Sequence, residues 1–168
     1  KEVEVRSVLG SFLFSGDDVY KELGQLSGGE KVRLALCKMF KRRPNLLILD
    51  EPTAGLDPAG RDEILGLVSK MHRELGITIL LVSHSMEDVA EYVDRIIVMN
   101  HGAVMFDALP KQVFAHYKEL EAVGLAAPQV TYLVHELAER GLPVDTQATT
   151  AKEAAQTILS ALREKNVI

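Results

Sequence analysis

Two acidic residues follow directly on a short apolar run, in a position that suits phosphate chemistry. Residues 46–49 read Leu-Leu-Ile-Leu, and Asp50 and Glu51 come next. Such a run, bounded by turn-forming residues, is typical of a strand buried on both faces of a parallel sheet. Its carboxyl end then lies at the sheet edge where ligands bind in open α/β folds. There Asp50 is suited to hold Mg²⁺, and Glu51 to orient or deprotonate a water molecule.

A histidine occupies the matching position after the next apolar run. Residues 77–82 read Ile-Thr-Ile-Leu-Leu-Val, and His84 follows them. A right-handed crossover makes the two strands parallel, so their carboxyl ends meet at one edge. We therefore expect His84 and Glu51 to face one pocket, where a neutral imidazole can donate to a γ-phosphate oxygen. The plainer alternatives are a solvated turn for the acids and a helix-terminal, capping role for His84.

Residues 26–30, Leu-Ser-Gly-Gly-Glu, mark the start of a helix. Ser27 and Glu30 form the capping-box pattern. Free backbone N–H groups and the helix dipole attract phosphate at such an end. Gly28 and Gly29 also let another backbone approach closely. A purely structural interpretation, a capped helix with flexible glycines, is compatible with the anion-binding one.

Other reactive residue types give weaker signals. Asp57, in the loop 54–57, is by itself an ordinary helix N-cap. Cys37 has no evident base partner and is expected to be a small, semi-buried residue. Basic residues at 38–43 suit the C-terminal end of a helix, and no aromatic residues are interleaved to stack bases. The histidines lack metal-ligand spacing, which argues against a structural zinc site.

Composition places the chain among ordinary globular proteins. It has 168 residues, of which 47% are hydrophobic and 26% charged, with a net charge of -5. A negative surface does not favour nucleic acid or anionic lipid. A single cysteine excludes an internal disulfide and fits a reducing cytoplasm. The longest apolar run, 77–82, is too short to span a bilayer, and residues 1–4 lack the apolar region of a signal peptide.

The remaining pattern predicts an α/β region at 1–108 and a helical appendage at 109–168, which is a candidate dimerisation element. The expected strands cover residues 46–49, 77–82, 95–99 and 103–106, the last two as a hairpin. The expected helices cover residues 3–14, 27 to about 42, 61–74, 86–93, 110–122, 129–140 and 150–165.

Four segments together resemble the ATP-binding-cassette (ABC) ATPases. The signature motif of that family resembles residues 26–30 (Leu-Ser-Gly-Gly-Glu), and its Walker B strand resembles residues 46–53 (Leu-Leu-Ile-Leu-Asp-Glu-Pro-Thr). The D-loop resembles residues 54–57 (Ala-Gly-Leu-Asp), and the switch-histidine segment resembles residues 81–84 (Leu-Val-Ser-His). The order and spacing of the four segments also match. The resemblance implies a P-loop NTPase fold, an α/β architecture with a three-layer parallel sheet. It also implies ATP and Mg²⁺ as cofactors.

The resemblance also implies a role for each matching residue. Asp50 would serve Mg²⁺, Glu51 would be the catalytic carboxylate and His84 the switch histidine. The cofactor-binding residues would be Ser27, Gly28, Gly29, Glu30 and Asp57. The first four lie in the signature motif, which faces ATP held by a second ATPase subunit, and Asp57 would help to couple the two nucleotide sites.

Shorter segments resemble two different branches of this family. Residues 82–89, 109–114 (Leu-Pro-Lys-Gln-Val-Phe) and 128–131 (Pro-Gln-Val-Thr) are similar to ATPase subunits of energy-coupling-factor and cobalt importers. Residues 3–18 are instead similar to ABC-F translation factors, which act on ribosomes. The importer-like match, over 26–168, is the longer one. It implies a transmembrane coupling protein as partner and a cytoplasmic location at the inner face of the cell membrane.

The Walker A loop, G-x-x-x-x-G-K-S/T, does not occur in these residues. We therefore expect this chain alone neither to bind ATP tightly nor to hydrolyse it. Because the Walker A strand is normally central to the sheet, strands 46–49 and 77–82 should expose apolar faces or edges.

The function expected from the sequence is to couple Mg-ATP binding and hydrolysis to import of a vitamin or metal ion, as the C-terminal portion of an ATPase subunit. One alternative is a non-enzymatic assembly module, or a fragment or chimera that needs a complementary chain. The other is an ABC-F ribosome-associated factor.

Overall fold

The computed structural model describes residues 2–165, and the chain divides into two compact units, residues 1–84 and 85–168. Each unit has a hydrophobic core of its own. The division lies upstream of the predicted domain boundary at 108/109, because the hairpin before that boundary packs with the helices that follow it. The boundary at 108/109 stays a prediction. Among the described residues, no helix combines the length and apolar character needed to cross a bilayer.

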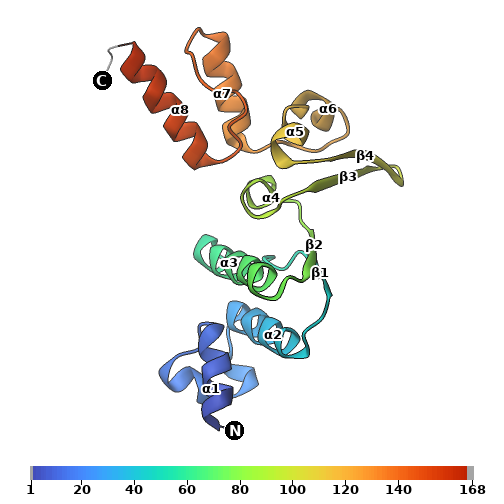
Figure 1. Ribbon diagram of the computed structural model, residues 1–168, viewed down its shortest axis with the longest axis vertical. Coiled ribbons are helices and arrows are strands. Elements are labelled where there is room, and N and C mark those ends of the chain that lie inside the picture. Colours follow the sequence, from blue (N-terminus) through green and yellow to red (C-terminus); the bar gives the residue numbers. More distant parts are fainter. Residues whose placement is uncertain (1, 166–168) are drawn as a thin grey trace. The chain divides into compact units, whose positions relative to one another are not determined.

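The first unit packs three α-helices and two strands around one core (Figure 1). The helices are α1 (Glu2–Ser11), α2 (Gly28–Arg42) and α3 (Pro58–Leu75), and the strands are β1 (Leu46–Asp50) and β2 (Thr78–Val82). Two 3-10 turns, η1 (Gly16–Tyr20) and η2 (Leu23–Gln25), connect α1 to α2. The core is closed by aliphatic and aromatic side chains, including Phe12, Leu36, Leu47, Ile64 and Met71.

Local sequence signals fix the ends of α2 and α3. Ser27 caps α2, and the full capping box with Glu30 forms as predicted. Asp57 caps α3, because its Oδ1 accepts the N–H of Gly60 at 2.8 Å. The prediction placed the start of this helix at residue 61, but the helix begins at Pro58. Proline suits this first position, because its missing N–H would have no partner within the helix. Gly76 ends α3 at φ 64, as expected for a glycine cap.

Strands β1 and β2 form a parallel pair, as the crossover predicts. Leu47 and Leu49 point into the core and are buried, whereas Leu46 and Ile48 are 50% and 61% exposed. Leu80 and Val82 of β2 are similarly exposed, so one apolar face of this sheet is open. The prediction that strand 46–49 is buried on both faces is therefore wrong for this chain, since the core covers only one side. The expectation of an exposed apolar face is confirmed.

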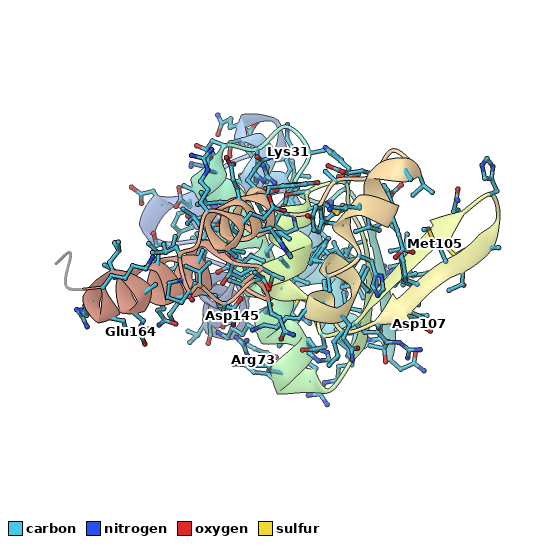
Figure 2. The ribbon with its side chains drawn as sticks, turned by 90° about the horizontal axis from the view of Figure 1, so that it is seen from above. Lys31, Arg73, Met105, Asp107, Asp145 and Glu164 are labelled. Carbon is cyan, nitrogen blue, oxygen red and sulfur yellow. The ribbon has the colours of Figure 1, made fainter. Side chains whose placement is uncertain are left out.

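The second unit begins with a short helix and a hairpin. Its elements are α4 (Met86–Tyr92), β3 (Ile96–Asn100), β4 (Ala103–Ala108), α5 (Pro110–Phe114), α6 (Tyr117–Ala122), α7 (Gln129–Glu139) and α8 (Ala151–Glu164). Strands β3 and β4 pair antiparallel, as predicted. The guanidinium of Arg95 donates to both carboxylate oxygens of Asp107, which ties the hairpin at its base; Figure 2 labels Asp107 on β4.

The helices after the hairpin differ from prediction at one place. The prediction of a single helix over residues 110–122 is wrong, because Ala115 and His116 separate α5 from α6. The His116 ring stacks on Phe106 with centroids 5.0 Å apart, and its ψ of 32 interrupts the helical backbone. Helices α7 and α8 match the predicted ranges closely. At the start of α8, Thr150 accepts the N–H of Glu153.

Candidate functional site

Glu51 and His84 lie in direct contact although 33 positions separate them. Oε1 of Glu51 is 2.7 Å from Nδ1 of His84. The two residues follow β1 and β2, whose last residues, Asp50 and Val82, are paired in the parallel register. The N–H of Glu51 donates to the carbonyl of Val82 at 2.9 Å, which continues the ladder past the end of β1. The structure thus brings together the pair that parallel strands predict, while their roles stay predictions.

The contact constrains the protonation of the His84 ring. An ionised carboxylate can only accept a hydrogen bond, so Nδ1 must be the protonated nitrogen. In a neutral ring Nε2 is then an acceptor, and it donates to a phosphate only when the ring carries both protons. The role of His84 toward a phosphate therefore stays a prediction. The His84 side chain is 86% exposed and that of Glu51 31%, so the pair is open to a ligand.

Asp50 ends β1 on the exposed face of the sheet. Among the described residues, no group of three or more Asp, Glu, His or Cys side chains could hold a metal ion. Mg²⁺ does not need such a cage, because it is usually held by one or two carboxylates, water and substrate phosphates. The assignment of such an ion to Asp50 stays a prediction.

The start of α2 presents hydrogen-bond donors. Oγ of Ser27 accepts the N–H of Glu30 at 3.2 Å, and Oε2 of Glu30 accepts the N–H of Ser27 at 2.7 Å. Within the described part of the chain, the N–H groups of Gly28 and Gly29 have no partner. Because Ser27 Oγ already accepts, its hydroxyl proton is available to an outside acceptor. Several donors at a helix N-terminus suit an anion.

The two glycines are not required by packing within this chain. A Cβ on Gly28 or Gly29 would lie 3.8 Å from Cδ2 of Leu56, which is an ordinary van der Waals contact. The same distance places Leu56, in the loop before α3, against the start of α2. Asp57 is occupied as the N-cap of α3, the plainer of its two predicted roles. Its coupling role stays a prediction.

The start of α2 and the Glu51–His84 pair are separate groups within the first unit. Across residues 2–165, no hydrogen bond or ion pair that the structure records joins them. The capped helix end also has a neighbour that sequence reasoning missed. Lys21 Nζ lies 2.7 Å from Oε1 of Glu30. No periodicity or motif relates these two positions, so only the fold reveals the contact.

Glu30 is strongly acidic in this setting. Its hydrogen bond from Lys21, followed by that from the Ser27 N–H, lowers the pKa of the carboxyl from 4.5 to about 2. The Glu30 side chain is only 12% exposed, and both of its oxygens are engaged. The capping box therefore carries a fixed negative charge at any pH near neutrality.

Comparison with known proteins places the chain in a family. The family model for the ABC transporter matches residues 3–54. The chain belongs to the ATPase domains of ABC transporters, and its P-loop NTPase-type α/β fold agrees with the prediction. Its sequence is similar to the energy-coupling factor transporter ATP-binding proteins EcfA2. That of Clostridium perfringens is 46% identical over 89% of this chain and 53% of the relative.

Further relatives give the same result. EcfA2 of Clostridium tetani is 50% identical over 84% of this chain and 49% of the relative. EcfA2 of Acetivibrio thermocellus is 43% identical over 96% of this chain and 57% of the relative. The chain thus spans about half the length of the curated relatives it matches. The last alignment and the family model both take in most of residues 3–18, so this segment also has a counterpart outside the ABC-F factors.

Solved structures agree with the sequence comparison. CbiO1 from Clostridium perfringens, described as part of the ABC transporter complex cbiONQ, has a TM-score of 0.58 and 38% identity over 80% of this chain and 55% of its own. A dimeric ATP-binding cassette in a post-hydrolysis state, bound to ADP and Pi, has a TM-score of 0.52 and 26% identity over 62% of this chain and 44% of its own.

Proposed function

We propose that this chain supplies the signature helix, the Walker B carboxylates and the switch histidine of an importer ATPase. Such an ATPase couples Mg-ATP binding and hydrolysis to uptake of a vitamin or metal ion. The observation that carries the proposal is the 2.7 Å contact between Glu51 and His84 at the carboxyl ends of two parallel strands. A carboxylate held there can take a proton from an attacking water, and the histidine fixes its orientation.

The other site residues have complementary tasks in this proposal. Asp50 holds Mg²⁺, which when bound neutralises charge on the phosphates. At the start of α2, Ser27, Gly28 and Gly29 donate hydrogen bonds to the γ-phosphate of ATP held by a second ATPase subunit, and Glu30 keeps that end capped. Asp57, in the loop that touches this helix through Leu56, couples the two nucleotide sites.

The proposed partners are a second ATPase subunit and a transmembrane coupling protein. Support comes from the relatives, which are named as ATP-binding proteins of energy-coupling factor transporters, and from similar structures described as dimeric or as part of a transporter complex. The proposed location is cytoplasmic and peripheral, at the inner face of the cell membrane. Binding of nucleic acid is not favoured, since the net charge is -5.

We further infer that the 168 residues do not turn over ATP unaided, because they contain no G-x-x-x-x-G-K-S/T. The test is complementation. This chain is mixed with the portion of Clostridium perfringens EcfA2 that lies outside the aligned region, and Mg-dependent phosphate release is measured. Activity should appear only in the mixture and should fall about 100-fold or more in Glu51→Gln.

The surface variant Glu74→Gln is the matched control and should keep full activity in the mixture. Turnover by the chain alone that Glu51→Gln abolishes would contradict the inference that it needs a complement. Activity in the mixture that does not depend on Glu51 would contradict the assigned role of this residue.

A second candidate, a non-enzymatic assembly module, has its own supporting observation. The apolar face of the β1–β2 pair, formed by Leu46, Ile48, Leu80 and Val82, is about half exposed in this chain. An apolar face of this kind favours association. Stable assembly with the complementary portion and no ATPase activity would favour this candidate. The ABC-F alternative stays a hypothesis, which cosedimentation with ribosomes tests.

A further inference from the structure

Lys21 connects two acidic side chains at the start of α2. Its Nζ lies 2.6 Å from Oδ1 of Asp18 and 2.7 Å from Oε1 of Glu30. The other oxygen of Glu30 accepts the N–H of Ser27 at 2.7 Å. A continuous series of charged contacts therefore runs from the turn η1, where Asp18 lies, to the N-cap of α2.

The Glu30 carboxylate has two opposing effects at this helix end. Its charge stabilises the helix, because negative groups are favoured near an N-terminus. The same charge repels an anion that approaches the free N–H groups of Gly28 and Gly29. An ammonium in direct contact with Glu30 offsets that repulsion, and a second contact, with Asp18, helps to hold the ammonium in place.

We infer that Lys21 is a positioning residue for the anion-binding end of α2: it holds the Glu30 carboxylate in the capping box and offsets its charge. The inference rests on the proposed function of Gly28 and Gly29 as phosphate donors. Lys21 acts only through Glu30, so it need not touch the phosphate. Among the described residues, Lys21 is the charged group recorded as acting on the Glu30 carboxyl, and Asp18 contacts Lys21 and feels the charge of Glu30.

The lowered pKa of Glu30 agrees with this geometry. Lys21 is the largest cause of the low pKa of Glu30, about 2, ahead of the Ser27 backbone N–H. The same contacts raise the pKa of Lys21, with Asp18 as the larger cause and Glu30 next. Each partner therefore stabilises the charged form of the other.

The test compares three variants of the full 168-residue chain: Lys21→Met, Lys21→Arg and, as a matched control on α2, the exposed Lys38→Met. The Glu30 carboxyl carbon is titrated by NMR, and hydrogen exchange of the Ser27 amide is measured. In Lys21→Met the Glu30 pKa should rise from about 2 toward 4.5. Exchange at Ser27 should become roughly two- to fivefold faster, as expected for loss of a partly exposed ion pair.

Rescue and coupling separate positioning from a general effect of charge. Lys21→Arg should keep both readouts near those of the wild type, and so should Lys38→Met. In a Glu30→Gln background, Lys21→Met should change Ser27 exchange by less than in the wild type, because no carboxylate remains for Lys21 to hold.

An unchanged Glu30 titration in Lys21→Met would overturn the inference. So would an equal response to Lys38→Met, or an undiminished effect of Lys21→Met when Glu30 is glutamine. None of these readouts uses ATP. Failure of the proposed function appears instead as absent turnover in the complementation experiment, so the two failures are distinguishable.

Discussion

Glu51 reaches His84 from a left-handed backbone, at a φ of 44. An L-residue in this region is strained by about 1–2 kcal/mol. The conformation is held by the Glu51 N–H, which donates to the Val82 carbonyl, and by the Glu51 carbonyl, which accepts from Ala54. The turn after β1 therefore sets the direction of the carboxylate through its backbone. Strain of this kind is often found at functional sites.

A comparison of two variants at position 51 measures the strain. Both Glu51→Gly and Glu51→Ala remove the contact with His84, but only glycine relaxes at positive φ. We expect Glu51→Gly to be the more stable by about 1 kcal/mol in urea unfolding. The same pair at Asp62, inside α3, is the control, and there alanine should be the more stable. Equal stability of the two variants at position 51 would show that the turn carries no such strain.

Two glycines of α3 should respond to alanine in opposite ways. A Cβ on Gly60 would stand 2.9 Å from Oδ1 of Asp57 and displace the N-cap, whereas a Cβ on Gly66 meets nothing within 4 Å. Loss of a cap costs about 1 kcal/mol, and alanine gains about 0.5–1 kcal/mol inside a helix. We expect Gly66→Ala to have a higher free energy of unfolding than the wild type. Gly60→Ala should have a lower free energy of unfolding than Gly66→Ala. Thermal or urea unfolding measures both, and equal shifts would argue against the Asp57 cap.

Glycine at positions 28 and 29 should matter for activity and not for folding. Gly28→Ala and Gly29→Ala meet only Leu56 at ordinary contact distance, so the free energy of unfolding should stay within about 0.5 kcal/mol of the wild type. In the complementation assay each should lower ATPase activity by more than about tenfold, because a Cβ would hinder close approach of the phosphate to the backbone N–H groups, and a loss of about 1.4 kcal/mol of transition-state stabilisation has that effect. Gly24→Ala, in the turn η2, is the control. A large loss of stability, or full activity, would each contradict the assignment.

The capping box should make the free energy of unfolding depend on pH over a defined acidic range. The Glu30 pKa is about 2 in the fold and 4.5 for an unperturbed carboxyl. Because the folded pKa is the lower one, the stabilisation is complete above pH 4.5 and is lost as the pH falls toward 2. Glu30→Gln keeps an acceptor for Ser27 without the charge. The difference in unfolding free energy between wild type and Glu30→Gln should shrink across this window, and a constant difference would count against the ion pair with Lys21.

Local chemistry made several features predictable. The capping box of Ser27 and Glu30, the N-cap at Asp57 and the hairpin of β3 and β4 all depend on residues that lie close together in the sequence. The contact of Glu51 with His84 spans a longer distance, yet it follows from two apolar runs and the handedness of the crossover. Such features need no knowledge of what else the chain packs against.

The sequence by itself determined the family, the order of the elements and the identity of the candidate site residues, because these depend on residue type and short spacing. Only the tertiary structure decided that Leu46 and Ile48 are exposed, that Lys21 contacts Glu30 and that Nδ1, rather than Nε2, is the His84 nitrogen in contact with Glu51. Burial depends on what covers a strand, and an ion pair depends on where a turn folds back. The free nitrogen depends on which ring atom the carboxylate engages. No periodic pattern in the sequence predicts these three features.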